Sequence, residues 1–411
     1  MSNHLADDLL IDAEDQDSSP PPMLRRWLLG LAMLVVACNL RPALTSLGPV
    51  LTEIRHDLPQ LGWLSGVLTM LPVLCMGLAG PFAPMQARRW GAERVILGWL
   101  AVLIAGLALR GLGNVVPLFT GTALAGIAIG IVGVLLPGLV KRDFRDHGTL
   151  MTGLFTMALC WGAAFAAGIS VPLTHALDGA WALALGAWAL PAVIAAVVWW
   201  PTLPKRDAAA APALHPVRGL WRQALAWQVT LFMGLQSALA YAVFGWLAPI
   251  LRDRGLDPAL AGWVVSFSVV VQLPAALITP ILAGRARDQR AAVAIVLGAT
   301  LAGLLGCFYA PLGGIWLWAA LLGVGQGGAF SLALTLIVLR AKDSHVAAQL
   351  SSMAQSAGYT VAAFCPLALG ALHDFAGSWD GAGPLVALVA LAALWAGLGA
   401  GRQIHISGAP S

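Results

Sequence analysis

The sequence has very little charge for its length. Only 10% of its 411 residues are Asp, Glu, Lys or Arg, whereas a soluble globular protein has about 25%. At the same time, 59% of the residues are apolar, so there is too little polar surface to cover a water-soluble body. This composition excludes an ordinary soluble enzyme and predicts a protein of the lipid bilayer.

Residues that build metal sites, disulfides and catalytic centres are also sparse. The five cysteines all lie in apolar stretches, and none has the spacing of a disulfide or metal-ligand pair. The eight histidines are scattered through predicted loops and tails, and no nucleotide-binding loop is present. We therefore predict no enzyme activity, no metal site and no cofactor. The expected partners are a small-molecule substrate and the bilayer, with no nucleic acid, and the protein is expected to function as a monomer.

The chain does contain apolar runs long enough to cross a bilayer. A membrane helix needs about 20 apolar residues, and cutting the sequence at charge clusters and at Pro or Gly breaks gives twelve such runs. They are 27–51, 61–83, 93–112, 116–139, 149–173, 181–200, 225–251, 259–283, 291–310, 315–339, 349–372 and 383–400. The runs lack the period-2 alternation of a membrane barrel. The predicted fold class is an all-α membrane protein with twelve transmembrane helices.

The basic residues are distributed unequally between the two sides of these spans. The tails and the connections after even-numbered spans hold 18 of the 23 Lys and Arg residues. By the positive-inside rule, both termini are expected in the cytoplasm, and the expected location is a bacterial inner membrane. Residues 1–24 are acidic and carry no signal-peptide pattern, so they are predicted to form a disordered cytoplasmic tail.

A weak internal repeat divides the chain into two parallel halves. Under a shift of 200 residues, the sequence around Pro49 aligns with that around Pro249, and Trp63 aligns with Trp263. The segment 201–224 is rich in Pro and Ala and is predicted to be a cytoplasmic linker. The predicted domains are six-helix bundles at 25–200 and 225–400, followed by a short tail at 401–411.

Twelve spans, a central linker and basic loops after spans two and eight are similar to the major facilitator superfamily. The loop from Gly80 to Arg94 resembles a degraded form of its G-x-x-x-D-R-x-G-R-R signature, without the aspartate. The resemblance implies a gating loop that contains Arg88, Arg89 and Arg94. The first-span segment from Asn39 to Pro49, with the letters NLRPALTSLGP, resembles the branch of cyanate permeases and 2-nitroimidazole transporters. It implies carriage of a small anionic or strongly polar solute.

Arg41 is the one charge predicted inside the membrane. An arginine at the centre of a span costs about 2.5–3.5 kcal/mol on insertion scales, so its retention indicates a use. All 19 acidic residues fall in predicted tails or loops, which leaves no buried carboxylate to neutralise it. Pro42 removes one backbone hydrogen bond and should loosen the helix beside Arg41. We interpret Arg41 as an anion site; the alternative is that it caps carbonyl groups of a broken helix.

Other polar side chains are predicted to contact the same solute. Asn39 and Thr45 flank Arg41, with helix–helix contact as the alternative for each. Tyr241 aligns with Arg41 under the 200-residue shift, and Ser237 lies one turn before it. The remaining candidates come from spans five, eight, ten and eleven, where Gln355 and Tyr359 belong to a polar stripe; they are Trp161, Gln272, Gln326, Gln355 and Tyr359.

These features favour a secondary transporter that works by alternating access, with Arg41 as the substrate anchor. The alternative is a non-transporting membrane sensor of the same solute, and a channel is less favoured because the repeat suits a gated carrier. If protons are coupled to transport, they are expected to travel on the substrate itself, on Glu53 at the outer end of span one, or through exchange of solutes.

Overall fold

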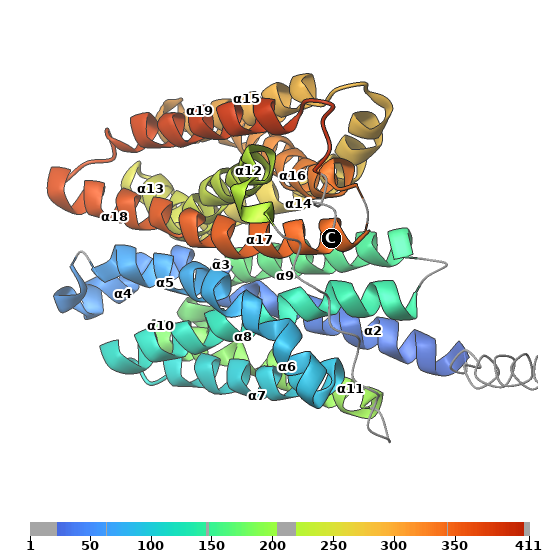
Figure 1. Cartoon of the computed structure of the whole chain (residues 1–411). Coiled ribbons are helices and arrows are strands. Elements are labelled where there is room, and N and C mark those ends of the chain that lie inside the picture. The colour runs from blue at the N-terminus through green and yellow to red at the C-terminus, as the bar shows by residue number, and fades with distance from the viewer. Residues whose placement is uncertain (1–22, 63, 145–147, 204–218, 343, 407–411) are drawn as a thin grey trace, which may run out of the picture.

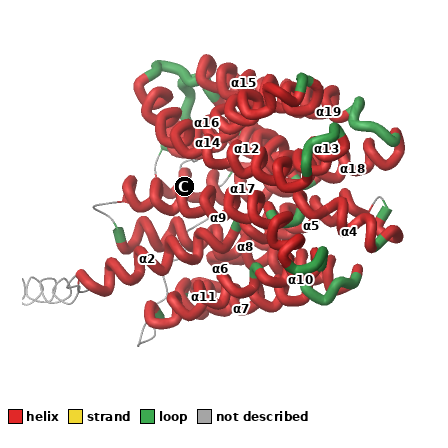
Figure 2. The backbone as a smooth tube through the Cα atoms, turned by 180° about the vertical axis from the view of Figure 1, so that it is seen from behind, coloured by secondary structure: helices red, strands yellow, loops and turns green. Residues whose placement is uncertain are grey.

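The computed structural model describes residues 23–62, 64–144, 148–203, 219–342 and 344–406, and within these ranges the chain is helical with no strand (Figure 2). Residues 1–22 of the predicted acidic tail and most of the predicted linker lie outside the described residues. Twelve described helical segments are long and apolar enough to cross a membrane, and each overlaps one predicted span. The predicted number and order of spans are confirmed.

The helices form two groups that lie one above the other in Figure 1. The first half, lower in that view, contains α2 (Met23–Leu40), α3 (Pro42–Thr45), α4 (Leu51–Asp57), α5 (Leu64–Ala79), α6 (Ala83–Trp90), α7 (Ala92–Arg110), α8 (Val115–Asp143), α9 (Gly148–Ala176), α10 (Trp181–Ala187) and α11 (Ala189–Trp199). The second half contains α12 (Ala224–Ala242), α13 (Ala248–Asp253), α14 (Pro258–Arg285), α15 (Arg290–Tyr309), α16 (Ile315–Arg340), α17 (Ser344–Ala362), α18 (Phe364–Ala376) and α19 (Ala382–Ala400).

Two helix pairs form the seam between the halves: α5 packs against α17, and α9 packs against α14. Small residues allow this close approach. A Cβ atom added to Gly77 of α5 would lie 2.7 Å from the backbone nitrogen of Thr360 in α17. Packing of small residues in this way is the usual route to helix association in a bilayer, where the hydrophobic effect between helices is absent.

Several spans are interrupted, and prolines explain the breaks that matter for function. Span one is divided into α2, α3, a 3₁₀ turn at Gly48–Val50 and α4. Span seven changes from α12 to a π-helical turn at Val243–Leu247 before α13. Pro49 and Pro249 lie at these breaks, and a proline cannot donate the hydrogen bond that a regular helix requires. We call the end of the bundle where α2 begins the terminal end, and the opposite one the far end.

Hydrogen-bonded charges join the two halves at the far end. Glu53 of α4 accepts a hydrogen bond of 2.8 Å from Arg252 of α13, which also donates to the carbonyl of Pro49 at 3.0 Å. Arg55 of α4 pairs with Asp374 of α18 at 2.5 Å. The 3₁₀ turn lies so close to span seven that a Cβ atom on Gly48 would be 2.2 Å from the carbonyl oxygen of Phe244. The far end is therefore closed in this structure.

Candidate functional site

Arg41 lies at the break in span one. Helix α2 ends at Leu40 and α3 begins at Pro42, with Arg41 between them at φ −93° and ψ −25°. Pro42 has no N–H to offer to the carbonyl of Cys38, so the α2 hydrogen-bond ladder stops there. The predicted loosening of span one beside Arg41 is confirmed.

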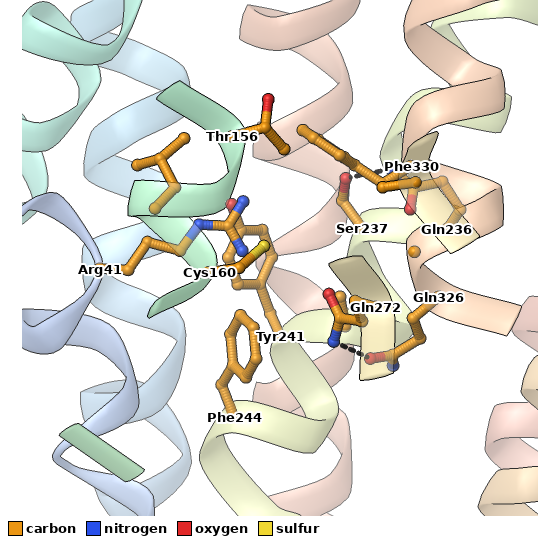
Figure 3. Close-up of a pocket in the computed structure, with 14 residues that line it drawn as sticks. Arg41, Thr156, Cys160, Gln236, Ser237, Tyr241, Phe244, Gln272, Gln326 and Phe330 are labelled. Carbon is orange, nitrogen blue, oxygen red and sulfur yellow. Dashed lines mark hydrogen bonds between the residues drawn. The ribbon is translucent and has the colours of Figure 1, made fainter. Parts of the chain in front are cut away.

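A cavity of about 540 Å³, including its opening, lies beside Arg41. Its walls come from both halves: Arg41 and α9 on one side, and α12, α14 and α16 on the other (Figure 3). Because it lies at the interface between the halves, this cavity is the candidate binding site.

The guanidinium of Arg41 has two aromatic neighbours. Its central carbon lies 5.8 Å from the ring centre of Phe244 and 5.7 Å from that of Phe330. Within the described residues, no carboxylate pairs with Arg41 and no side chain or backbone group accepts a hydrogen bond from it. Rings at this distance attract a cation, typically by about 0.5–2 kcal/mol, but they accept no conventional hydrogen bonds. The five N–H donors of Arg41 are left for a ligand.

Four predicted contacts of the solute do come together at this cavity. Arg41, Tyr241, Gln272 and Gln326 all line it. Ser237 lines it as well, one turn before Tyr241 on the same face of α12. Gln272 and Gln326 are hydrogen-bonded to each other at 3.3 Å across α14 and α16. The geometry therefore permits these residues to contact one ligand.

Trp161 does not line this cavity. Its side chain is 61% exposed on the outer surface of α9, which in a membrane faces lipid or the interface. Its neighbour Cys160, together with Thr156 one turn earlier, lines the cavity instead. Successive side chains on a helix point about 100° apart, so the prediction identified the right span but the wrong face.

Three other candidates do not line the cavity, and their polar atoms bond to their own helices. The Asn39 amide donates to the carbonyl of Val35 at 2.8 Å. The Thr45 hydroxyl donates to the carbonyl of Arg41 at 3.2 Å. The Gln355 amide donates to the hydroxyl of Ser351 at 2.9 Å. These three side chains lie outside the cavity lining in this conformation, and their contact with a solute stays a prediction.

Tyr359 lies behind the cavity wall. Its ring packs edge to face against that of Tyr241, with 6.1 Å between the ring centres. The Tyr241 ring makes a similar contact with Phe244 at 6.2 Å. Tyr359 therefore supports a ring that lines the cavity without lining it itself.

The predicted gating loop lies at the terminal end, away from the cavity. Arg88 and Arg89 are exposed in the last turn of α6, and the Arg89 guanidinium lies 5.2 Å from the ring centre of Trp90. Arg94 is exposed in the first turn of α7. A gating role for the three arginines stays a prediction.

One acid of this region is buried, contrary to the expectation that all acids lie in loops. Glu93 is 7% exposed in the first turn of α7 and pairs with Arg142 near the end of α8. Burial lowers the pKa of Arg142, but the hydrogen bonds and charges of Asp143 and Glu93 outweigh it and raise that pKa above its usual value. The buried Glu93 carboxylate is thus compensated by the positive charge of Arg142.

Arg41 is also not the only arginine inside the bundle. The charge distribution assigned Arg110 to a connection, but its side chain is fully buried at the end of α7. Its Nη1 donates to the carbonyl of Ala43 at 2.9 Å, while its Nε and Nη2 have no hydrogen-bond partner within the described part of the chain. A charged side chain at the end of a helix can point into the bundle or toward solvent, and only the packing of the helices determines which.

Sequence reasoning also missed cavity residues that helical spacing could have found. Phe330 follows Gln326 by four residues on α16, and Phe244 follows Tyr241 by three on span seven. Residues three and four apart share a helix face. The predicted residues Gln326 and Tyr241 therefore indicate that Phe330 and Phe244 face the cavity too. Gln236 gave no such signal because it is adjacent to Ser237.

Comparison with known proteins gives consistent relatives over nearly the whole chain. Residues 29–366 match the family described as the Major Facilitator Superfamily. An uncharacterized transporter of Bacillus subtilis, YycB, is 40% identical over 92% of this chain and 94% of its own. The 2-nitroimidazole transporter of Escherichia coli is 38% identical over 93% and 97%, and the cyanate transport protein CynX of the same organism is 28% identical over 85% and 91%.

Solved structures with similar folds are also transporters. A bacterial homologue of the human lysosomal transporter Spinster superposes with a TM-score of 0.69 at 15% identity, covering 93% of this chain and 94% of that one. The nucleoside transporter NupG superposes with a TM-score of 0.71 at 14% identity, covering 90% and 99%. At these identities the likeness concerns the fold alone.

Proposed function

Because the chain belongs to the major facilitator superfamily and is a multi-pass membrane transporter rather than an enzyme, we propose that it carries a small anionic or polar solute anchored by Arg41. The family match confirms the resemblance to the superfamily, and the relatives named for 2-nitroimidazole and cyanate confirm the resemblance of the first span to their branch. The observation that carries the proposal is a guanidinium with free donors at a cavity between two halves. Transporter-named relatives favour transport over sensing.

Two kinds of solute follow from the names of the relatives. One relative is named for 2-nitroimidazole, a flat heteroaromatic ring, and another for cyanate, a small anion. Both kinds present an electron-rich group to a guanidinium fork. The rings of Phe244 and Phe330 suit the faces of a flat solute and keep water from competing with its hydrogen bonds to Arg41.

The proposed mechanism is alternating access. Arg41 belongs to the first half, whereas Tyr241 and Phe330 belong to the second, so a bound solute would contact both halves at once. The Arg252–Glu53 and Arg55–Asp374 pairs would hold the far end closed while the terminal end is open. Rocking the halves about the solute would break these pairs and open the far end.

The basic residues support an orientation with both termini in the cytoplasm of a bacterial cell, in its inner membrane. Lys and Arg are concentrated on the terminal side of the spans, and cytoplasmic loops carry such an excess. The far end would then face outward. Labelling of Cys160 from each side of the membrane tests this sidedness.

The role of Arg41 is tested with Arg41→Ala and Arg41→Lys. We expect Arg41→Ala to weaken binding of 2-nitroimidazole or cyanate about 10- to 100-fold, because it removes charge-assisted hydrogen bonds. Arg41→Lys keeps the charge without the planar fork and should retain part of the affinity. Affinity is measured by calorimetry on purified protein, and flux of the better ligand in proteoliposomes.

Arg285→Ala is the matched control, since Arg285 is exposed at the end of α14, away from the cavity. It should bind like the unmodified protein. Equal affinity of Arg41→Ala and the unmodified protein for every ligand would overturn the anchor role, and an absence of flux with intact binding would argue against transport.

A further inference from the structure

Two carboxamides of the second half are held in fixed orientations beside the cavity. Gln326 Nε2 donates to the backbone carbonyl of Leu239 at 3.4 Å, and Gln272 Nε2 donates to Gln326 Oε1 at 3.3 Å. A backbone carbonyl can only accept a hydrogen bond. The amide nitrogen of Gln326 must therefore face Leu239, its oxygen must face Gln272, and the nitrogen of Gln272 must face Gln326.

This chain of hydrogen bonds leaves the oxygen of Gln272 free. In Figure 3 that oxygen points away from Gln326, toward the side of the cavity where Arg41 and Tyr241 lie. Within the described residues, Gln272 Oε1 accepts no hydrogen bond. The backbones of α14 and α16 are in close contact here and hold the two glutamines in place. A Cβ atom on Gly327 would lie 2.3 Å from the backbone carbonyl oxygen of Gln272.

Gln236 shows the same arrangement on α12. Its Nε2 donates to the carbonyl of Met233 at 3.0 Å and to the hydroxyl of Ser237 at 2.7 Å. Its nitrogen is fixed by a group that can only accept, so its oxygen is the atom left over. Gln272 and Gln236 thus each present an amide oxygen that accepts no hydrogen bond within the described residues.

Arg41 and the free oxygen of Gln272 are therefore complementary in hydrogen-bonding character. Arg41 can only donate, and the free oxygen of Gln272 can only accept. We infer that the cavity selects a small planar solute with an acceptor group for Arg41 and an N–H or O–H donor for Gln272. This inference rests on the proposed function and deepens it. A nitroimidazole-like ring with an N–H group can bond to both Arg41 and the Gln272 oxygen, whereas a cyanate-like anion offers no donor to that oxygen.

The physical reason for the selectivity is the cost of an unpaired buried acceptor. Gln272 is 7% exposed. A solute that covers its oxygen without offering a donor removes hydration from that oxygen and forms no hydrogen bond in its place, which costs binding free energy. An anion without hydrogen also brings its lone pairs toward the partial negative charge of the amide oxygen. Sites built to bond a donor reject analogues that lack it much more strongly than apolar pockets reject a size change.

The test compares 2-nitroimidazole with 1-methyl-2-nitroimidazole, which has the same ring and nitro group but no N–H. Calorimetry on the purified full-length protein, at mildly acidic pH so that the ring keeps its N–H, measures both affinities. We expect the methylated compound to bind about 10- to 100-fold more weakly. In Gln272→Leu, which removes the acceptor at similar volume, the two affinities should come within about threefold.

Gln355→Leu is the matched control, because that amide bonds within α17 and does not line the cavity. It should keep the full discrimination between the two compounds. Discrimination that persists in Gln272→Leu would show a steric effect of the methyl group and overturn the inference.

The failure of this inference is distinguishable from that of the proposed function. Equal binding of both compounds with a loss in Arg41→Ala would overturn donor selection and leave the anchor intact. Binding unaffected by Arg41→Ala would overturn the proposed function itself. Nitrate, an acceptor-only probe, should bind more weakly than 2-nitroimidazole; tighter binding would also contradict donor selection.

Discussion

Two adjacent residues of α9, Cys160 and Trp161, face opposite environments. Cys160 is 6% exposed and lines the cavity, whereas Trp161 is 61% exposed on the outside. In a bilayer, a large exposed aromatic side chain is favourably placed in lipid or at the membrane–water interface. Residue type therefore favoured Trp161 as the cavity residue, although Cys160 lines the cavity, because tryptophan is a typical binding residue and a cysteine in an apolar stretch is not.

The aromatic wall around Arg41 leads to a prediction at this scale. Phe330→Leu keeps an apolar side chain but removes a ring 5.7 Å from the guanidinium. We expect it to weaken binding of a flat ligand about three- to tenfold, through loss of cation–π and stacking contacts. Calorimetry with 2-nitroimidazole measures the change. Trp161→Leu serves as the control and should bind normally; an equal loss in both variants would contradict a specific role for the Phe330 ring.

At the scale of single elements, the break in span one determines how α9 packs. Pro42 leaves the carbonyl of Cys38 without its usual helical donor. Helix α9 covers this carbonyl with Gly162, where a Cβ atom would lie only 1.9 Å from the oxygen. A glycine seam of this kind permits the close contact that places Thr156 and Cys160 beside Arg41.

Gly162→Ala should therefore separate α9 from α2. We expect a lower apparent melting temperature in detergent, because overpacking at a rigid backbone contact is destabilising, together with weaker ligand binding. Gly153→Ala on the same helix is the control: its added Cβ would meet only a side-chain atom of Leu277 at 3.8 Å. A melting temperature of Gly162→Ala equal to that of Gly153→Ala would show that the contact can relax.

At the scale of the whole molecule, the far end is closed by charges that come from different halves. Glu53 and Arg252 are 199 positions apart and meet at 2.8 Å, and Arg55 meets Asp374. The four side chains are partly buried, and even an exposed ion pair can contribute up to about 1 kcal/mol to stability. A contribution of that size can still shift an equilibrium between two conformations severalfold.

Glu53→Gln should therefore populate the state that is open at the far end. We expect faster labelling of Cys160 by a membrane-impermeant maleimide added outside intact cells, with Cys160→Ser giving the background from other cysteines. Glu93→Gln is the control, since Glu93 pairs with Arg142 inside the first half. It should leave external labelling unchanged.

Inside-out vesicles separate the two assumptions in this experiment. An increase seen only in these vesicles would mean that the proposed orientation is reversed. No increase from either side would mean that the Glu53–Arg252 pair does not hold the far end closed.

The sequence by itself determined the twelve spans, the interruption beside Arg41 and the cation at mid-membrane. These follow from apolar run length, the missing N–H of Pro42 and the placement of charge, all of which are local properties of the chain. Helical spacing also relates Phe330 to Gln326 and Phe244 to Tyr241, so the sequence already indicated that each pair shares a helix face.

Only the tertiary structure decided which side chains meet. The rotation of α9 selects Cys160 over Trp161, and the approach of α7 to α3 buries Arg110 against the carbonyl of Ala43. The Leu239 carbonyl, on a different helix, orients the amides of Gln326 and Gln272. Helix rotation and packing set these contacts, and a nearly uniform apolar sequence leaves both underdetermined, because lipid and protein interior are equally apolar.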